Sequence, residues 1–340
     1  MSDRIITAIA ESSEESALIT VMDVRGSAPR HAGSKMLVRR GADSLGTVGG
    51  GKGEARAIAI ARECIEQKRA DTITLEFKGM EVEGQDMICG GTCLLLVEYI
   101  ADREPYRIAF ARLQRGERTL FAKTLDGAAG GKPLSVTVTV LDENSAPIYN
   151  TLPSSARKVA ERSLHSGTPA FREAEGVFFD PVSPREKLLV LGGGYVGQAV
   201  ALQASRLDFR VSVGDDRPDF CSAERFPPHV EALCGSYTEI VRKFPFDSAT
   251  YVVMVTRGHL TDLECVRAVL KRKYRYAGFI GSARKSKLLR AQLKRDGFEQ
   301  EKIDTLHAPI GLDIKAETPA ELAVSILGEI IAVRRHADQK

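Results

Sequence analysis

The spacing of apolar and polar residues divides the chain into two parts with different patterns. In the first part, short apolar or alternating segments predict β-strands. These strands are expected at residues 17–24, 35–39, 44–48, 72–77, 93–100, 119–125 and 135–142. Helices are predicted at residues 4–15, 54–68 and 154–167. This mixture favours an α+β domain.

In the second part, apolar strands alternate regularly with helices. The strands are expected at residues 187–194, 209–216, 251–258 and 276–282, with helices from 195, 261 and 283. Such alternation predicts a parallel sheet. A last helix is predicted from Pro319, because Thr318 and Glu321 have the spacing of a capping box. Its core-facing stripe is expected to comprise Ala323, Ile326, Leu327, Ile330 and Ile331.

A proline-rich, charged stretch at residues 178–187 lies between the two patterns and suits a linker. We therefore predict an α/β protein of two domains. Residues 1–180 form an N-terminal α+β domain, and residues 181–340 form a Rossmann-like C-terminal domain with a parallel sheet.

Composition and charge argue against several classes of protein. Of 340 residues, 43% are hydrophobic and 27% are charged, as in ordinary soluble globular proteins. The 48 basic and 45 acidic residues leave a net charge of only +3, Trp is absent, and aromatic residues make up 6%. A nucleic-acid partner is therefore not expected. No membrane span is expected either, because no apolar stretch approaches the roughly 20 residues that a span needs.

Cysteine usage and the first residues predict the compartment. Six cysteines are scattered without the spacing of a disulfide framework, which favours a reducing environment. The N-terminal residues lack the apolar core and cleavage site of a signal peptide. We therefore expect a cytoplasmic protein.

Residues 46–53 nearly satisfy the pattern of a phosphate-binding P-loop. Gly46, Gly51 and Lys52 match it, but Gly53 replaces the serine or threonine that holds Mg²⁺. A glycine turn and a helix start remain, and backbone N–H groups at a helix start favour an anion. The pattern thus disfavours nucleotide hydrolysis and predicts an anion site at Gly49, Gly50, Gly51 and Lys52.

Two further loops of the first domain carry candidate chemistry. Residues 26–30 end at Arg30, and Cys89 is followed by Gly90 and Gly91. A thiol beside exposed backbone N–H groups has a lowered pKa, which would make Cys89 a nucleophile or a soft metal ligand. The alternative is an inert buried cysteine. Cys93 lies on the next strand and is predicted to belong to the core.

The second domain contains a glycine fingerprint directly after a strand and at the start of a helix. Gly192 would allow the tight turn, Gly194 the approach of a pyrophosphate, and Gly197 close packing of helix on strand. Asp215, at the end of the next strand, could accept hydrogen bonds from ribose hydroxyls. The site either binds a dinucleotide such as NAD or belongs to a Rossmann-like domain that holds another ligand or none.

Basic residues follow two further strands of the same predicted sheet. Arg257, His259, Arg284 and Lys285 would lie at the edge where ligands of open α/β sheets bind, so they could converge on an anion. Taken singly, each is better explained as a solvated residue at a helix start, and only their shared position at strand ends favours an anion site. His307 is either a pocket residue or a packed loop histidine.

Several segments in order along the chain carry a resemblance to a known family. They are GSAPRHAGSKMLV, GTVGGG and MICGG in the first domain, and LLVLGGGYVGQAVA, DDRPDF, VTRGHLTD, GFIGSARK and HAPIGLDIKAETPAELAVSILGEI in the second. Over nearly its full length the chain resembles the XdhC/CoxI family, accessory proteins for xanthine dehydrogenase and related molybdenum hydroxylases.

The resemblance implies a protein that binds the molybdenum cofactor, molybdopterin, and protects it during sulfuration. It further implies insertion of the cofactor into a molybdenum hydroxylase apoenzyme, a cysteine desulfurase as another partner, and a homodimer. Cys89 would face the molybdenum or its sulfur. Family members commonly have cysteine at the position of Lys52, so here a cation able to hold phosphate would replace a thiolate.

Two other functions stay open from the residues alone. An NAD-dependent oxidoreductase would use the glycine fingerprint and Asp215, with His259 and His307 as its candidates for proton transfer. A nucleotide-handling enzyme would use the near-P-loop, but the missing hydroxyl at Gly53 weakens that hypothesis.

Overall fold

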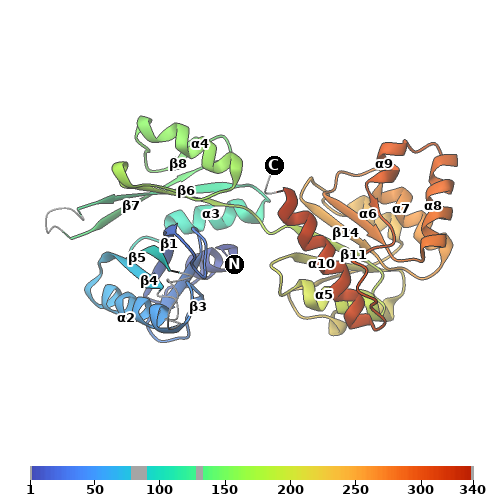
Figure 1. Cartoon of the computed structure of the whole chain (residues 1–340), viewed down its shortest axis with the longest axis horizontal. Coiled ribbons are helices and arrows are strands. Elements are labelled where there is room, and N and C mark those ends of the chain that lie inside the picture. Colours follow the sequence, from blue (N-terminus) through green and yellow to red (C-terminus); the bar gives the residue numbers. More distant parts are fainter. Residues whose placement is uncertain (1, 78–89, 128–132, 338–340) are drawn as a thin grey trace, which may run out of the picture. The chain divides into compact units, whose positions relative to one another are not determined.

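The computed structural model describes residues 2–77, 90–127 and 133–337, and the chain divides into two compact units (Figure 1). The first unit is Met1–Pro184 and the second is Arg185–Lys340. Each unit has hydrophobic clusters made from its own residues. Each is therefore described by itself.

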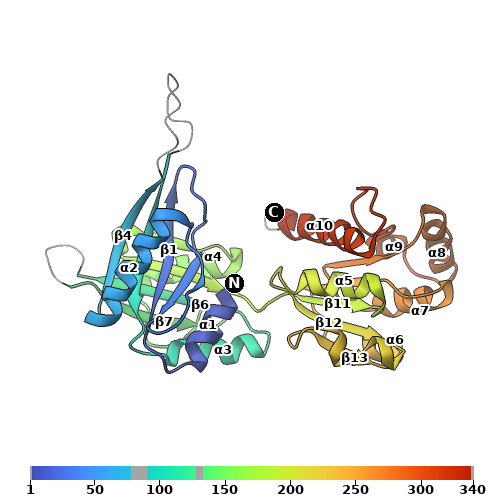
Figure 2. The same ribbon diagram turned by 90° about the horizontal axis from the view of Figure 1, so that it is seen from below.

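The first unit contains two antiparallel sheets. One has the order β3-β2-β1-β5-β4, with bounds β1 Ser16–Arg25, β2 Lys35–Arg39, β3 Leu45–Gly46, β4 Ala70–Phe77 and β5 Gly91–Tyr99. The other has the order β8-β7-β6-β10-β9, with bounds β6 Thr119–Asp126, β7 Ser135–Leu141, β8 Pro147–Tyr149, β9 Ala170–Arg172 and β10 Val177–Val182. Residues of both sheets share two hydrophobic clusters, so the sheets pack on one another (Figure 2).

Helices cover the remaining faces of this sandwich. Helix α2 (Gly51–Gln67) packs its buried side on the first sheet through Ala57, Ala61, Cys64 and Ile65. Helix α4 (Arg157–Ser166) follows the 3₁₀ turn Ser154–Ala156 and covers the second sheet. Helices α1 (Ser2–Glu11) and α3 (Glu104–Gln114) join one of the clusters shared by the sheets. The sequence pattern gives no prediction for α3.

The interior between the two sheets includes buried charges. The Lys35 ammonium lies 2.9 Å from Asp180 Oδ1, and the Lys123 ammonium is hydrogen-bonded to Glu98. All four side chains are at most 5% exposed. Removing a charge from water is costly unless it is paired, so these two pairs restrict how the sheets can be assembled.

The predicted linker at residues 178–187 is wrong over most of its length. Residues Val177–Val182 form β10, which lies between β6 and β9, and Phe178 and Phe179 are fully buried. The charge and the proline that suggest a linker are accommodated within the sheet. Asp180 is neutralised by Lys35, 145 residues earlier in the chain, and this pairing cannot be read from the local sequence.

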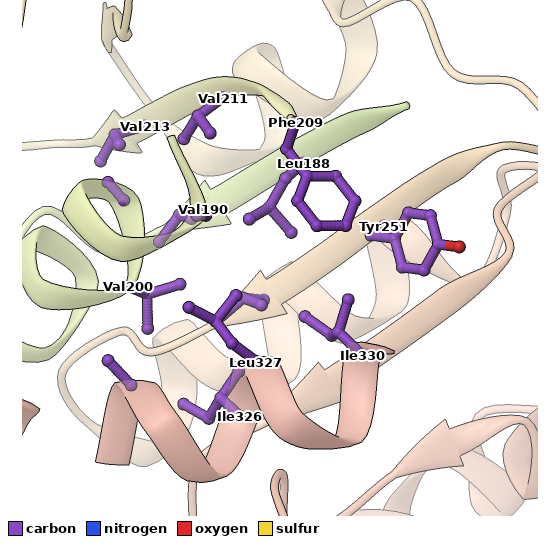
Figure 3. Close-up of a cluster of buried hydrophobic side chains, with 14 of the residues drawn as sticks. Leu188, Val190, Val200, Phe209, Val211, Val213, Tyr251, Ile326, Leu327 and Ile330 are labelled. Atoms are coloured by element: carbon purple, nitrogen blue, oxygen red, sulfur yellow. The ribbon is translucent and has the colours of Figure 1, made fainter. Parts of the chain in front are cut away.

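The second unit has one parallel sheet of order β13-β12-β11-β14-β15-β16, the doubly wound order of a Rossmann fold. Its strands are β11 Lys187–Leu191, β12 Arg210–Asp215, β13 Glu231–Cys234, β14 Thr250–Met254, β15 Tyr276–Phe279 and β16 Leu306–His307. Helices α5 (Tyr195–Ala204) and α10 (Pro319–Ala337) share a core with one face (Figure 3). The other face packs against α6 (Tyr237–Lys243), α7 (His259–Val269), α8 (Ala283–Arg295) and α9 (Gln300–Asp304). The predicted α/β class, with an N-terminal α+β part and a Rossmann-like C-terminal part, is confirmed.

The last helix begins as its capping box predicts. The Glu321 carboxylate accepts a hydrogen bond from the Thr318 N–H at 3.0 Å, and the Glu321 N–H donates to Thr318 Oγ1 at 3.3 Å. Four residues of the predicted stripe are buried: Ala323, Ile326, Leu327 and Ile330. Ile331 is 37% exposed, so its assignment to the core is wrong. Among the described residues, no helix combines the length and apolar character needed to cross a bilayer.

Breaking the Lys35–Asp180 pair from one side should strongly destabilise the first unit. We expect Asp180→Ala to cost about 3–5 kcal/mol in urea unfolding, because Lys35 is left charged and buried. Asp23→Ala, which removes an exposed partner of Arg25, should cost about 1 kcal/mol or less. The double variant Lys35→Met/Asp180→Leu should recover most of the loss. Equal losses for Asp180→Ala and Asp23→Ala would contradict this account.

Candidate functional site

Three glycine-containing loops leave the same end of the first sheet. Strand β1 ends where its antiparallel partner β5 begins, and β3, which runs parallel to β1, leads into residues 47–50. Two of the loops touch through their backbones. If a Cβ atom were added to Gly26, it would lie 2.6 Å from the carbonyl oxygen of Gly90, and a Cβ atom added to Gly91 would lie 2.2 Å from the carbonyl oxygen of Ser27. The structure therefore brings the loops of Arg30 and of Gly90–Gly91 together.

The glycine triplet supplies the backbone turn that starts α2. Gly49, Gly50 and Gly51 have φ values of 147°, 76° and 62°, a region in which residues with side chains are strained. A Cβ on Gly50 or Gly51 would meet no atom within 4 Å. These two glycines are thus required by the backbone conformation, and the space beside them is open.

The chain's own carboxylate already occupies part of this turn. Glu54 Oε2 accepts hydrogen bonds from the Val48 N–H at 2.9 Å, the Gly50 N–H at 3.1 Å and Thr47 Oγ1 at 2.5 Å. Burial alone would raise the pKa of Glu54, but these hydrogen bonds outweigh it and lower the pKa. The turn thus holds one negative charge of the chain itself, and this role of Glu54 was missed from the sequence.

The donors left for an external anion lie in the first turn of α2. Backbone N–H groups of residues 51–53 have no acceptor within the helix, as at every helix start. Lys52 and Arg30 are both exposed. Cys89, the predicted nucleophile or metal ligand, lies outside the described residues. Cys93 is fully buried, which confirms its assignment to the core, and burial raises its pKa.

The glycine fingerprint of the second unit combines tight packing with one open position. A Cβ on Gly192 would lie 2.5 Å from the Val255 carbonyl oxygen, and one on Gly197 would lie 1.7 Å from that of Gly192. Around Gly194, the residue that caps α5, a Cβ would meet nothing within 4 Å. The first and third glycines thus fit strand and helix together, and a ligand could approach at the second.

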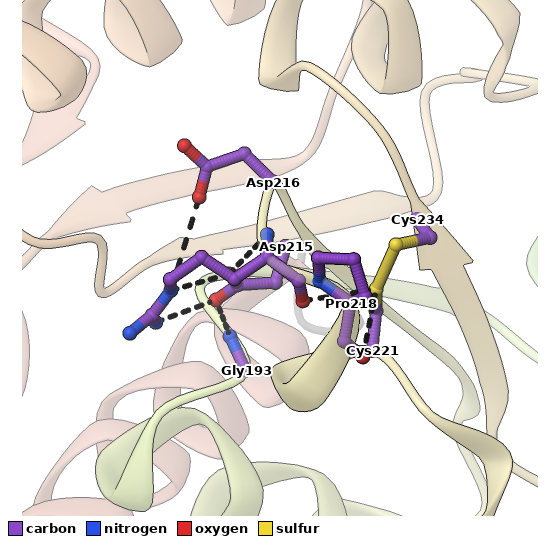
Figure 4. Close-up of a disulfide and its surroundings, with 7 residues drawn as sticks. Gly193, Asp215, Asp216, Pro218, Cys221 and Cys234 are labelled. Atoms are coloured by element: carbon purple, nitrogen blue, oxygen red, sulfur yellow. Dashed lines mark hydrogen bonds and ion pairs between the residues drawn. A yellow bond between two sulfur atoms is a disulfide. The ribbon is translucent and has the colours of Figure 1, made fainter.

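Asp215 is fully buried and bonded to the chain itself (Figure 4). Its Oδ2 accepts from the Gly193 N–H at 2.7 Å, and its Oδ1 accepts from the backbone N–H and Nε of Arg217 at 3.0 and 2.9 Å. Burial would raise the pKa of Asp215, but the hydrogen bonds from Arg217 and Gly193 outweigh it and lower the pKa. In this conformation both carboxylate oxygens of Asp215 are hydrogen-bonded within the chain, and one of them holds the glycine turn.

The segment after β12 contains interactions that sequence reasoning missed. The guanidinium carbons of Arg217 and Arg225 lie over the Phe220 ring, 3.6 Å and 4.9 Å from its centroid. Arg225 Nη2 also donates to the Gly193 carbonyl at 3.3 Å. The motif DDRPDF was the available signal, because it places an arginine and an aromatic residue directly after the fingerprint acid. Cys221 is disulfide-bonded to Cys234 at the end of β13, a pairing that the scattered cysteine spacing did not indicate (Figure 4).

The other predicted basic residues share the expected sheet edge but differ in their surroundings. Arg257 and Arg284 are exposed in the segments after β14 and β15. Lys285 is ion-paired with the buried Asp262, which also accepts from Thr256 Oγ1 at 2.5 Å, so its charge is already balanced within the chain. His259 is the first residue of α7, and its side chain lies outside the description.

His307 lies in strand β16, not in a loop, and packs against neighbouring side chains. Its Nδ1 lies 3.1 Å from Glu329 Oε1, and its ring packs on Tyr276 with centroids 4.4 Å apart. Glu329 also accepts from the Tyr276 hydroxyl at 2.5 Å and the Gly311 N–H at 3.1 Å. Across the described ranges, no three His, Cys, Asp or Glu side chains gather as ligands for a metal ion.

Comparisons with known proteins agree with this two-part organisation. Residues 9–78 match the XdhC and CoxI family, residues 188–330 match the XdhC Rossmann domain, and the two matches together cover more than half of the chain. A probable xanthine dehydrogenase subunit of Bacillus subtilis is 24% identical over 97% of this chain and 96% of its own length. The molybdenum cofactor insertion chaperone PaoD of Escherichia coli is 24% identical over 96% of this chain and 86% of its own length.

A solved structure shares the fold. It is a crystal structure described as a xanthine dehydrogenase from Bacillus halodurans, with a TM-score of 0.81 and 23% identity. The similarity covers 99% of this chain and 96% of that chain.

The bonds of Glu54 predict a specific pH dependence. Because folding lowers the pKa of Glu54, its ionised carboxylate stabilises the folded protein fully at pH values above its unfolded pKa of about 4.3. This stabilisation is lost as the pH falls through the folded pKa. We expect Glu54→Gln to cost about 1 kcal/mol near neutral pH, as loss of a helix cap does, and less in acid. Urea unfolding between pH 3 and 7 checks this, with Glu66→Gln on the exposed side of α2 as the control. A pKa of Glu54 at or above 4.3 in a carbon-13 NMR titration would contradict it.

Proposed function

Because this chain belongs to the XdhC and CoxI family, we propose that it is an accessory protein for the molybdenum cofactor. It binds the cofactor as cargo, protects it while the terminal sulfido ligand is installed, and inserts it into a molybdenum hydroxylase of the xanthine dehydrogenase type. One observation carries the proposal: the similarity to an insertion chaperone extends over 96% of the chain and includes both units.

The glycine turn of the first unit supports a role in holding the anionic end of the cargo. The cofactor is a pterin dithiolene that carries molybdenum and a phosphate or nucleotide. The open space at Gly50 and Gly51 lets such a group approach the N–H groups of the first turn of α2. Lys52 adds a mobile exposed cation there, and Arg30 supplies a second cation from a loop at the same end of the sheet.

Lys52 distinguishes this chain from the common family pattern. A thiolate at this position would be a soft ligand for molybdenum, whereas an ammonium binds oxygen anions and no metal. We therefore assign Lys52 to a phosphate or another oxyanion of the cargo. Cys89, with Gly90 and Gly91, is the proposed contact for molybdenum or its sulfur. Gly90 and Gly91 reach this end of the sheet through their contact with residues 26–27.

The Rossmann-like unit supports a separate contact with a nucleotide. Gly194 is open to a pyrophosphate, Gly192 and Gly197 shape the turn, and Arg257 and Arg284 are exposed at the same strand ends. These residues, with His259, are the proposed site for the nucleotide part of the cofactor or for a dinucleotide such as NAD. The other proposed features are a cytoplasmic homodimer and two protein partners, the target apoenzyme and a cysteine desulfurase.

An NAD-dependent oxidoreductase is the second candidate function. The doubly wound strand order and the glycine fingerprint favour it. The bonds of Asp215 disfavour it, because both carboxylate oxygens are already hydrogen-bonded within the chain. Calorimetric titration with NAD, together with an assay for hydride transfer, separates the two candidate functions. NAD binding accompanied by hydride transfer to a substrate would favour the oxidoreductase.

Direct binding of the cargo tests the proposal. We expect the protein, incubated without oxygen with released molybdenum cofactor, to elute from gel filtration with nearly one pterin per chain. The pterin is quantified by its fluorescence after oxidation. Cys89→Ser should lose the cargo while its circular dichroism and melting temperature stay unchanged. A folded wild-type protein that retains no pterin would overturn the proposal, and full retention by Cys89→Ser would overturn that residue's role.

Lys52 should contribute charge and not metal ligation. We expect Lys52→Ala to weaken cargo binding by about tenfold, since a hydrogen bond to a charged group is lost, and Lys52→Arg to keep most of it. Arg62→Ala, which removes another exposed cation from α2, is the matched control and should have little effect. Equal binding by Lys52→Ala and the wild type would exclude a contact between Lys52 and the cargo.

A further inference from the structure

The first unit has a cavity that the proposed function does not use. It measures about 400 Å³ and lies where β5 ends, between β7, β8 and the start of α3. The glycine loops lie at the other end of β5, where that strand begins. A strand of this length spans roughly 25–30 Å, so the cavity is a separate location.

The floor of the cavity is polar and includes a buried ion pair. Glu98 and Tyr106 line the cavity, and both are at most 4% exposed. Glu98 Oε1 accepts hydrogen bonds from the Lys123 ammonium and from the Tyr106 hydroxyl, the latter at 3.2 Å. Both hydrogen bonds that the Glu98 side chain makes to described residues end on Oε1, which leaves Oε2 as an acceptor for a ligand.

One wall of the cavity is apolar. Leu134, Val136 and Val138 face it from the β7 segment and are only half-buried, although each also packs against a hydrophobic cluster between the sheets. Small-molecule sites commonly combine such an apolar wall with a few convergent polar groups, and they have volumes of roughly 300–1,000 Å³. The cavity has both properties.

The charges around the cavity indicate a neutral ligand. Lys123 balances Glu98, so a cationic ligand would add a second positive charge beside Lys123, and an anion would face the carboxylate. At the rim, Arg69 pairs with Asp71 at 2.6 Å and Lys68 lies 4.0 Å from Glu15, whereas Asp102 keeps its charge and accepts a hydrogen bond from the Tyr149 hydroxyl. A hydrogen bond to a buried carboxylate is strong, which favours a ligand that donates a hydrogen bond, and an N–H group is one such donor.

We propose that this cavity is a binding site for a small, neutral, N–H-donating heterocycle. The ligand's N–H group donates to Glu98 Oε2, and its ring lies against Val136 and Val138. This inference is independent of the proposed function, because it uses neither the glycine loops nor the Rossmann-like unit.

The test uses calorimetry with two bicyclic probes on the whole chain. 2-Aminopurine is neutral at pH 7 and carries N–H donors, whereas caffeine has a related frame with every ring nitrogen either methylated or without hydrogen. We expect 2-aminopurine to bind at least tenfold more tightly than caffeine, since a hydrogen bond to a charged group is lost with the latter. Absence of 2-aminopurine binding at millimolar concentration, or equal binding of both probes, would overturn the proposal.

Two matched variants locate the site. Val136→Phe fills part of the cavity from its apolar wall and changes no charge, and it should weaken 2-aminopurine binding by at least tenfold. Ile148→Phe introduces the same side chain at an exposed position of β8 that does not line the cavity, and it should bind as the wild type does. Glu98→Gln should also weaken binding, but it leaves the buried Lys123 ammonium without an ionised partner. Val136→Phe is therefore the decisive variant. A folded Val136→Phe protein with unchanged affinity would place the probe elsewhere and reject the inference.

Discussion

Backbone-to-backbone contact at glycines determines the arrangement of the candidate loops in both units. In the first unit, Gly91 lies so close to Ser27 that a Cβ would collide with the carbonyl oxygen, and Gly26 has the same relation to Gly90. In the second unit, Gly197 packs on the Gly192 carbonyl in the same way. These contacts bring loop backbones, with their N–H groups, to the end of a rigid sheet. The position of the candidate ligand donors therefore depends on the absence of side chains at a few residues.

Both units also place one of their own carboxylates at a backbone turn. Glu54 accepts from the N–H groups that precede α2, and Asp215 accepts from the Gly193 N–H that precedes α5. In each case the hydrogen bonds outweigh the effect of burial, so the carboxylate stays ionised. The two carboxylates differ in how firmly they are held. Asp215 also accepts hydrogen bonds from Arg217 and is fully buried, whereas Glu54 is only half-buried.

Local patterns in the sequence predicted most of the fold. The alternation of apolar strands and helices identified the parallel sheet, and the spacing of Thr318 and Glu321 identified the start of α10. The prediction failed where a distant residue decides the outcome. The sequence of strand β10 looks like that of a linker, because Lys35, which pairs with Asp180 in this strand, lies 145 residues away.

For the candidate site, glycine spacing indicated which turns are tight but could not show which charges neutralise one another. The sequence placed Lys285 in an anion site, and the structure pairs it with Asp262. The capping role of Glu54 was likewise invisible, because a glutamate in the first turn of a helix is compatible with several partners. Asp215 stands where the fingerprint predicts an acid, but its partners Arg217 and Gly193 became clear only from the folded loop.

The carboxylate of Glu54 has a consequence for how quickly a bound anion can leave. When an external anion departs from an ordinary helix start, the N–H groups must be solvated by water before the ligand is fully released. Here Glu54 lies in the first turn of α2 and already holds the Val48 and Gly50 N–H groups, so these two donors are never left without an acceptor. Only the N–H groups of residues 51–53 would need to be solvated when an anion departs, and the negative charge of Glu54 beside them opposes its retention. A carboxylate built into the turn therefore favours weak binding and ready release of an anion.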